Sequence, residues 1–221
     1  MTGKPTIHVI GTGGTISGAG SSATAAAYES GQVEASELVA EVEGLSQVQS
    51  IETENLFATG SENLGPVQWR ILARRIEELT KSRDVDGVVV THGTDTLEEA
   101  SFFLDLVCKP SKPVVLTAAM RPATALSADG PANLYQAILA AASPQLKGHG
   151  ILLVMNGTVI PGWQAIKTDS AALESFCAYP NGIIGRISGE RLIVSSESCP
   201  SPLSGRFHDH LNKDGKLPLV R

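Results

Sequence analysis

The sequence predicts a three-layer α/β fold, in which a mostly parallel, doubly wound β-sheet is covered by helices on both faces. Along the first 155 residues, short β-branched runs alternate with segments of helical periodicity. Two of these runs, 88–90 and 151–154, are apolar at consecutive positions, as in strands buried on both faces. A chain of 221 residues with 42% hydrophobic content can form one large domain with a sizeable core.

The expected elements follow in chain order. Clusters of β-branched and aliphatic residues predict strands at 6–10, 47–52, 86–92, 113–118 and 150–155. Helical periodicity predicts helices at 36–42, 66–80, 96–107 and 131–142. The helical pattern is clearest at 66–80, where one apolar stripe is formed by Val67, Ile71, Leu72, Ile76 and Leu79. We expect this helix to cover the sheet.

The pattern changes after residue 155. Short apolar pieces separated by Gly and Pro, at 158–160, 165–167, 182–187 and 191–196, predict β-hairpins or an extension of the sheet edge. Residues 198–218 are polar, rich in Pro and Gly and without periodicity, which is typical of a linker. The final LPLVR resembles the start of another apolar strand. We therefore expect a domain at 1–195, followed at 196–221 by an interdomain linker and the start of a second domain.

Composition excludes several classes of function. The net charge is −6 and the 17 basic residues are scattered, so no basic stripe for nucleic acid is present. No run of about 18 apolar residues exists to span a membrane, and the first residues lack the features of a signal peptide. Cys108, Cys177 and Cys199 are widely spaced, without a C-x-x-C pair. We expect a soluble protein with three buried cysteines, no disulfide framework, no metal and no cofactor.

Polar segments follow several of the predicted strands. They lie at 11–28, 91–96, 118–131 and 156–167. Because ligands of open α/β sheets bind beyond the carboxyl ends of the strands, we expect all four segments to meet at one edge of the sheet.

The first of these segments is rich in glycine, but it matches no phosphate-binding motif. Ile16 stands where the dinucleotide fingerprint needs its third glycine, and no Lys-Ser or Lys-Thr follows. The glycines would let the backbone approach a ligand closely, beside the hydroxyls of Thr12 and Thr15 and the phenol of Tyr28. Taken alone, the segment is better explained as a plain strand-to-helix turn.

The segment THGTDT at 91–96 has two interpretations. Asp95 and Glu98 form a capping-box pattern, which predicts that Asp95 closes the N-terminus of the following helix. Helix capping by Asp95 does not explain why Thr91, His92 and Thr94 stand beside it. A helix N-terminus also favours a carboxylate or a developing oxyanion, so a binding role remains open beside the capping role.

A threonine hydroxyl is the nucleophile that these loops favour. The sequence has no G-x-S-x-G elbow and no suitable cysteine and histidine set. A threonine needs a proton-accepting network, for which Tyr28, Asp95 and Lys167 are candidates. Lys167 follows apolar residues, which is compatible with partial burial, but spacing alone favours a solvated lysine at a strand edge.

Six ordered motifs carry a family resemblance. They are TGGTI at 12–16, GSEN at 60–63, THGTDT at 91–96, AMRP at 119–122, SADGPANL at 127–134 and MNGTV at 155–159. In order and spacing the sequence resembles the N-terminal domain of the bacterial-type L-asparaginase (asparaginase/glutaminase) family. The resemblance extends nearly to the predicted linker. It implies an amidohydrolase that converts L-asparagine, and in some members L-glutamine, to the acid and ammonia.

The resemblance also implies catalytic roles. Thr15 would be the nucleophile that attacks the side-chain amide carbon and forms an acyl-enzyme, with Tyr28 as its hydrogen-bonding partner. Thr94, Asp95 and Lys167 would form a second group that activates the attacking species or the water that cleaves the acyl-enzyme.

Substrate binding is implied in the same way. Ser61 and Glu62 would hold the α-carboxylate and α-amino groups, and Asp95, beside Thr94, would pair with the ammonium. The carbonyl of Ala119 would accept a hydrogen bond from the leaving amide. Backbone amides at Gly13 and Gly14 could serve an oxyanion hole. We assign His92 a structural hydrogen-bonding role. The preference between asparagine and glutamine is not encoded in a motif, and we expect it to depend on Glu62 and the 17–28 loop.

Further expectations follow from the family. The family's full-length form is a dimer of dimers, so the resemblance implies a homo-oligomer. A second domain completes a neighbouring subunit's site in the family, so we expect poor turnover without it. Exported members carry a disulfide, but Ser82 and Arg83 stand where a partner of Cys108 is expected. This favours a cytoplasmic location, or a periplasmic one if an export signal has been removed.

Two alternatives remain open. The first is a non-catalytic amino-acid-binding module that keeps Ser61, Glu62 and Asp95 for binding. The second is the asparaginase-like subunit of a tRNA-dependent amidotransferase, which shares these motifs but is expected to carry an added N-terminal domain.

Overall fold

A central eight-stranded sheet organises the computed structural model, which describes residues 4–25, 27–45, 49–195 and 200–211. In spatial order its strands are β12 (Arg191–Val194), β11 (Gly185–Ser188), β8 (Thr158–Pro161), β7 (Ile151–Met155), β6 (Val114–Thr117), β5 (Gly87–Thr91), β1 (Thr6–Gly13) and β4 (Ser50–Thr59). Neighbours from β4 to β7 are parallel, and neighbours from β7 to β12 are antiparallel. The predicted mostly parallel sheet with an added hairpin region is confirmed.

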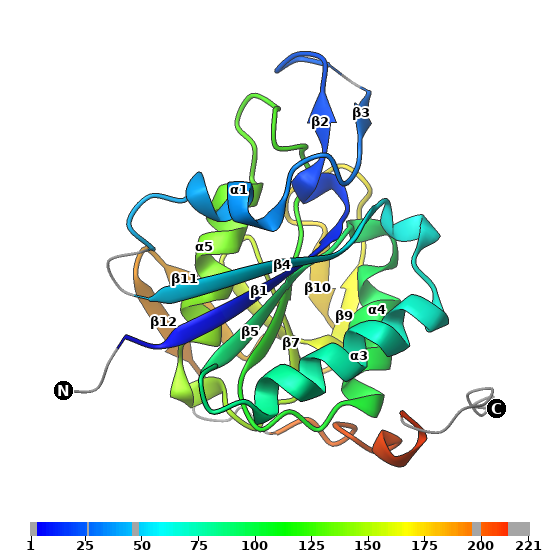
Figure 1. Ribbon diagram of the computed structural model, residues 1–221, viewed down its shortest axis with the longest axis vertical. Helices are drawn as coiled ribbons and strands as arrows, with labels where there is room; N and C mark the ends of the chain where they lie inside the picture. The colour runs from blue at the N-terminus through cyan, green and yellow to red at the C-terminus, as the bar shows by residue number, and fades with distance from the viewer. Residues whose placement is uncertain (1–3, 26, 46–48, 196–199, 212–221) are drawn as a thin grey trace.

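Helices cover both faces of this sheet (Figure 1). On one face lie α1 (Ala35–Ala40) and α5 (Gly130–Ala141), and on the other lie α3 (Pro66–Lys81) and α4 (Leu97–Val107). Among the described residues, none of the helices has the length and apolar character needed to cross a membrane. The three-layer, doubly wound architecture agrees with the prediction.

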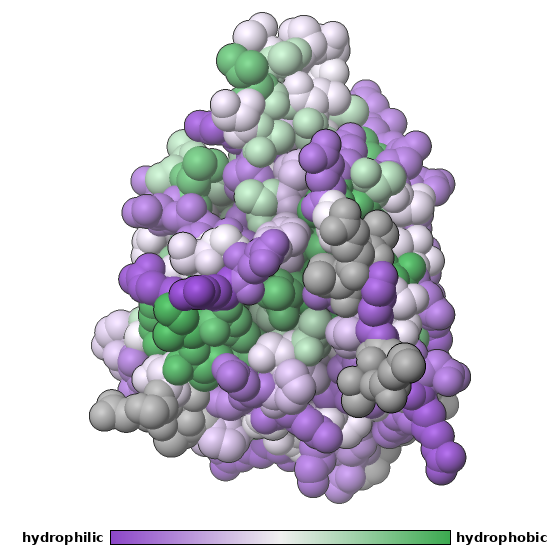
Figure 2. All heavy atoms as spheres, turned by 90° about the vertical axis from the view of Figure 1, so that its left-hand side faces the viewer, coloured by the Kyte–Doolittle hydropathy of each residue, from purple (hydrophilic) through white to green (hydrophobic). Residues whose placement is uncertain are grey.

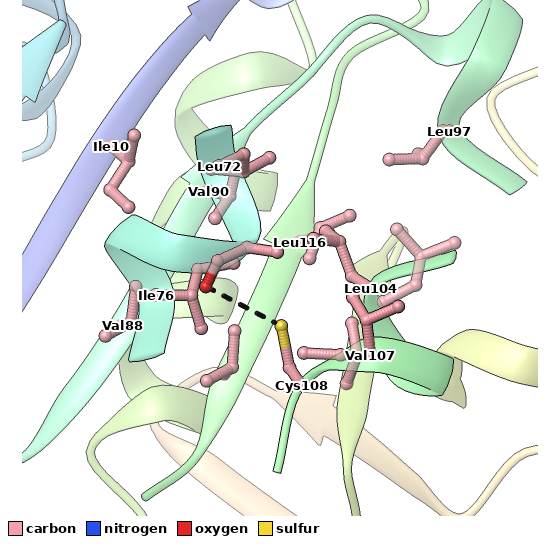
Figure 3. Packing of buried hydrophobic residues seen from close by; sticks show 14 of the residues in the cluster. Ile10, Leu72, Ile76, Val88, Val90, Leu97, Leu104, Val107, Cys108 and Leu116 are labelled. Atoms are coloured by element: carbon pink, nitrogen blue, oxygen red, sulfur yellow. Dashed lines mark hydrogen bonds between the residues drawn. The ribbon is translucent and has the colours of Figure 1, made fainter. Parts of the chain in front are cut away.

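The sheet separates two apolar cores because successive side chains of a strand point to opposite faces. Val88 and Val90 of β5 face α3 and α4, whereas Val89 packs on the α5 side. Figure 3 shows the first core, in which the Sγ of Cys108 points at the carbonyl oxygen of Ala73, 3.8 Å away. Burial raises the pKa of this thiol well above its ordinary value, so Cys108 behaves as a small apolar side chain, as predicted.

Two sequence expectations are corrected here. Cys177 is exposed rather than buried, because it lies on the outer side of the small β9–β10 sheet. In the predicted stripe of α3, Leu72, Ile76 and Leu79 are buried, but Val67 and Ile71 are 68% and 43% exposed. The buried face of α3 follows positions 72, 76 and 79, and the other two lie to one side of it.

The strand predicted at 47–52 is described from Ser50 as β4, and it extends beyond residue 52 to Thr59. Its polar sequence hid this length, since β4 is an edge strand and only part of it faces the core. Residues 46–48 lie outside the described residues, as do Cys199 and the parts of the predicted linker at 198–199 and 212–218.

Smaller elements surround the end of the sheet where the polar loops meet. Two short two-stranded sheets are formed by β2 (Ala19–Gly20) with β3 (Tyr28–Glu29) and by β9 (Ala165–Lys167) with β10 (Phe176–Ala178). The 3₁₀ helices are η1 (Thr15–Ser17), η2 (Ser61–Asn63), η3 (Thr94–Thr96), η4 (Pro144–Leu146), η5 (Gly162–Gln164) and η6 (His208–His210). The β2–β3 hairpin protrudes at the top of Figure 1, and in Figure 2 the surface at this end of the molecule is mostly pale, which means intermediate hydropathy.

The described part of the predicted linker, 200–211, packs back on α3 and α4. Asp105 of α4, which is fully buried, connects it to the sheet. Its carboxylate accepts hydrogen bonds from the backbone N–H of Ile151 in β7 and from the hydroxyl of Ser201. Burial raises the pKa of Asp105, and these two bonds only partly oppose the shift. The folded protein therefore binds a proton on Asp105 more readily than the unfolded chain does.

This raised pKa predicts a pH-dependent effect of Asp105→Asn. Above the folded pKa the ionised carboxylate costs stability in the folded state, and as the pH falls through that pKa the cost disappears. An amide can still accept from Ile151 and can donate to Ser201, so the variant should exceed the wild type in free energy of unfolding at pH 7. This advantage should shrink towards pH 4. Urea unfolding at several pH values measures it.

Asp105→Ala is the matched control. It leaves the N–H of Ile151 without its acceptor, which should cost about 1–3 kcal/mol at either pH. A variant Asp105→Asn that is less stable than the wild type at pH 7 would contradict the account.

Candidate active site

The site lies where the parallel strands β1 and β5 end side by side. Along the chain, the sheet adds β4 on one side of β1 and then β5, β6 and β7 on the other side. The point between β1 and β5, where the order of addition switches sides, is the position where open α/β sheets bind ligands. Gly13, the last residue of β1, and Gly14, which follows it, have φ values of 96° and 80°, which only glycine adopts without strain. A Cβ on Gly14 would collide with the backbone of Gly93, so the two loops touch backbone to backbone. This contact brings the residues after each strand together.

The first pair of reactive groups is Thr15 and Tyr28. Thr15 opens η1, directly after the two glycines, and is 8% exposed. Tyr28 lies in β3 of the protruding hairpin, and its hydroxyl is 2.7 Å from Thr15 Oγ1. The segment after β6 supports the hairpin, because Thr124 Oγ1 accepts a hydrogen bond from the N–H of Gly20. The structure thus brings together two predicted residues that are 13 positions apart.

The second group comes from two different sides of the site. Thr94 and Asp95 lie in η3 after β5, and Lys167 ends β9. Lys167 Nζ is 2.9 Å from Thr94 Oγ1 and 2.9 Å from Asp95 Oδ1. The lysine side chain is 18% exposed and the Asp95 side chain 66%. Lys167 is therefore partly buried rather than a solvated lysine at a strand edge, and the carboxylate of Asp95 remains open to a ligand.

Ser61 and Glu62 lie in η2, after the edge strand β4. The hydroxyl of Ser61 accepts a hydrogen bond from the N–H of Asp95, and its carbonyl accepts one from the hydroxyl of Thr96. Ser61 is 2% exposed, whereas Glu62 is exposed and accepts a hydrogen bond from the side chain of Asn63. The η2 segment is therefore fixed to the loop after β5.

These groups line one shallow polar pocket of about 210 Å³. Its walls are Gly14, Thr15, Tyr28, Ser30, Ser61, Glu62, Gly93, Thr94 and Asp95. Six of the eight predicted site residues are among them, and Lys167 reaches the pocket through its contacts with Thr94 and Asp95. Ser30 was not predicted. Its spacing of two residues from Tyr28 was the available signal, since alternate residues of an extended chain share a face.

Ala119 is fully buried and is not among the residues that line this pocket. It belongs to a turn whose backbone is held by hydrogen bonds with Asp129 and Asn133. The carboxylate of Asp129 accepts hydrogen bonds from the backbone N–H groups of Met120 and Arg121. The side chain of Asn133, which is 3% exposed, donates to Asp129 and to the carbonyl of Ala118. The SADGPANL motif therefore braces the AMRP turn.

Two predictions about hydrogen-bond partners are wrong, one for the helix cap and one for the oxyanion hole. Asp95 is not the cap of α4, because η3 occupies 94–96 and the N-cap is Thr96, with no side-chain capping bond. The carboxylate of Glu98, expected to complete the capping box, instead accepts a hydrogen bond from the N–H of Lys167. The N–H of Gly14 donates to the carbonyl of Thr59 at 2.8 Å, so it is not available for an oxyanion hole.

His92 lies beneath the site, fully buried. Its Nδ1 is 2.8 Å from the carbonyl oxygen of Gly93, and it does not line the pocket. Burial lowers the pKa of this imidazole, which keeps it neutral. A structural role for His92 agrees with this geometry. Among the described residues, no three or more His, Cys, Asp or Glu side chains gather as metal ligands would.

Comparison with known proteins identifies the family. Residues 6–199 match the family model described as "Asparaginase, N-terminal". The sequence is 39% identical over 216 residues to a probable periplasmic L-asparaginase of Haemophilus influenzae, and 41% identical over 216 residues to L-asparaginase 2 of Escherichia coli. It is 42% identical over 182 residues to a glutaminase-asparaginase of Pseudomonas fluorescens. These alignments cover 96%, 98% and 82% of this chain.

A solved structure agrees. The crystal structure of a probable cytoplasmic L-asparaginase from Campylobacter jejuni superimposes with a TM-score of 0.85 at 36% identity, covering 89% of this chain and 60% of that one. The chain spans 50–61% of the length of the three curated relatives. By its family-model match over 194 residues, its identity to these relatives and its fold, the chain belongs to the asparaginase family.

Proposed function

We propose that this protein hydrolyses the side-chain amide of L-asparagine, giving L-aspartate and ammonia, with Thr15 as the nucleophile. The observation that carries the proposal is the pairing of two hydroxyl-centred groups in one pocket. The side chain of Thr15 is hydrogen-bonded to that of Tyr28 within that pocket, and the side chain of Thr94 is hydrogen-bonded to that of Lys167. The named activities of the relatives support the same reaction.

In the first step, Thr15 Oγ1 bonds to the amide carbon of the substrate. The C–N bond breaks, and the amide nitrogen leaves as ammonia with the proton that the hydroxyl gave up. An ester between Thr15 and the aspartyl group remains. Tyr28, at 2.7 Å from Oγ1, is the group in position to receive or pass on the proton of Thr15.

In the second step, water attacks the ester carbon and releases L-aspartate and the free hydroxyl of Thr15. We assign the activation of either this water or the first nucleophile to Thr94, Lys167 and Asp95. Their side chains are joined by two contacts of 2.9 Å, which gives a path for a proton between the hydroxyl and the amine. No cofactor takes part in either step.

The charges of the pocket suit a small zwitterion. Asp95 and Glu62 present open carboxylates that can pair with the α-ammonium group. The hydroxyl of Ser61 is a candidate donor to the α-carboxylate, and the carbonyl of Ala119 is proposed to accept from the leaving amide. L-glutamine is proposed as an additional substrate, because one methylene changes binding by only about 1–3 kcal/mol. Glu62 and the 17–28 segment would set the ratio.

We further propose a cytoplasmic homo-oligomer, a dimer of dimers. The compartment is a prediction from the sequence, since the relatives include proteins named as periplasmic and as cytoplasmic. Light scattering on the purified protein tests the assembly, and cell fractionation tests the compartment.

Thr15→Ala tests the proposed chemistry. Without a hydroxyl to form the ester, ammonia release from L-asparagine should fall at least about a thousandfold. Calorimetric binding of L-aspartate should persist, because Asp95, Glu62 and Ser61 are untouched. Thr15→Ser, which keeps the hydroxyl, is the matched control and should retain turnover.

The outcomes separate two functions. Hydrolysis by Thr15→Ala at the wild-type rate would reject Thr15 as the nucleophile. A complete wild-type protein, second domain included, that binds L-aspartate but releases no ammonia from L-asparagine would instead indicate a binding module.

Gly93→Ala tests whether the pocket depends on the close contact between its loops. The added Cβ would lie 2.7 Å from Ser61 Oγ and 2.8 Å from Ser61 Cβ, so η2 must move away. We expect the KM for L-asparagine to rise at least about tenfold and the free energy of unfolding to fall by about 1–3 kcal/mol. The control is Gly65→Ala, whose Cβ would meet only a side-chain oxygen of Gln68, at 3.9 Å. Equal KM values for the two variants would contradict this explanation.

A further inference from the structure

We propose that Glu98 is a positioning residue for the reaction, holding Lys167 against Thr94 and Asp95 through the backbone of β9. The inference rests on the proposed function and adds a residue that does not line the pocket. Its sequence pattern suggested helix capping, but in the structure the carboxylate bonds to the N–H of Lys167 instead.

Lys167 needs such support because its strand is weakly held. The β9 strand has three residues. Among the described residues it pairs only with β10, which is equally short, in a sheet separate from the central one. A two-stranded pair of this length is not stable by itself in water. The position of Lys167 must therefore come from what holds β9 against the rest of the molecule.

Helix α4 supplies that support at two points one turn apart. Glu98, in its first turn, accepts from the N–H of Lys167. Ser101, which is fully buried, donates to the carbonyl of Gly162 at 2.9 Å, and Gly162 opens the η5 turn that leads into β9. Gly162 packs closely in this position, since a Cβ there would lie 2.9 Å from the carbonyl oxygen of Ile151 and 3.2 Å from Ser101 Cβ. Backbone before β9, at Gly162, and at its last residue, Lys167, is thus docked on one helix.

The same helix begins beside the other two members of the group. Thr94 and Asp95 lie in η3, which continues directly into α4. A single rigid element therefore sets Thr94 and Asp95 from its start and Lys167 from its first turn. The two 2.9 Å contacts of Lys167 Nζ require these parts to be in register. A shift of β9 by about 1 Å would break them and could slow the reaction about a hundredfold.

Charge is not the property of Glu98 that this role needs. The bond goes to a backbone N–H, for which any well-placed oxygen acceptor suffices, although a carboxylate gives the stronger bond. Glutamine can present an oxygen at the same place, whereas alanine cannot. Glu99 is the internal control, because it is adjacent on the helix, has the same chemistry and is exposed.

Glu98→Ala, Glu98→Gln and Glu99→Ala, made in the complete protein, test the proposal with L-asparagine as substrate. We expect Glu98→Ala to lower kcat about 10- to 100-fold with KM changed less than about threefold. Glu98→Gln should stay within about threefold of the wild type in kcat, and Glu99→Ala should match the wild type. Melting temperatures identify any variant that fails to fold.

A crystal structure of Glu98→Ala provides a readout that does not depend on activity. Lys167 Nζ should move out of hydrogen-bonding distance of Thr94 Oγ1 while the central sheet is unchanged. Lys167 found in its wild-type position overturns the proposal, whatever the rate. A displaced Lys167 with a wild-type kcat overturns it as well, because the positioning would then have no consequence for the reaction.

These outcomes are separate from a failure of the proposed function. If the complete wild-type protein releases no ammonia from L-asparagine, hydrolysis is rejected by that measurement alone. The distance between Lys167 and Thr94 in the Glu98→Ala crystal would still decide whether Glu98 positions Lys167.

Discussion

The site depends on the parallel pairing of β1 with β5. Their register, from Ile7 beside Gly87 to Gly11 beside Thr91, brings the carboxyl ends of both strands to the same edge of the sheet. The loops that follow then meet in a contact between Gly14 and Gly93 that excludes side chains. Everything reactive is arranged around this contact, with Thr15 on one side and Thr94 on the other. Catalytic geometry here is a consequence of sheet topology.

From this constraint, much of the fold and the site was predictable from the sequence. Buried parallel strands are apolar throughout, so the runs at 88–90 and 151–154 could be assigned without a structure. Polar residues that end such strands converge in any open α/β sheet, which is why Thr15, Thr94 and Asp95 could be grouped together. The edge strand β4 was predicted too short because its residues are polar wherever they face water.

The sequence could not reveal which of several possible hydrogen-bond partners a polar group would choose. The spacing of Asp95 and Glu98 fits a capping box, but the capping bond is absent because η3 moves the helix start to Leu97. Glu98 then meets Lys167, a residue 69 positions away. The N–H of Gly14 is likewise taken by Thr59 of a neighbouring strand. Such contacts between distant segments follow from tertiary packing, which local patterns do not encode. Ser30 is different, because a local pattern could have identified it: it lies two residues after Tyr28, and alternate residues of an extended chain share a face.

The account makes one central claim, that the pocket between Thr15 and Thr94 holds an amino-acid substrate for attack by Thr15. A crystal structure with bound L-aspartate tests it most directly. We predict the β-carboxylate of the ligand between Thr15 Oγ1 and Thr94 Oγ1, with the α-ammonium beside Asp95 and the α-carboxylate beside Ser61. L-aspartate bound elsewhere, or bound here with its side chain turned away from Thr15, would contradict the account.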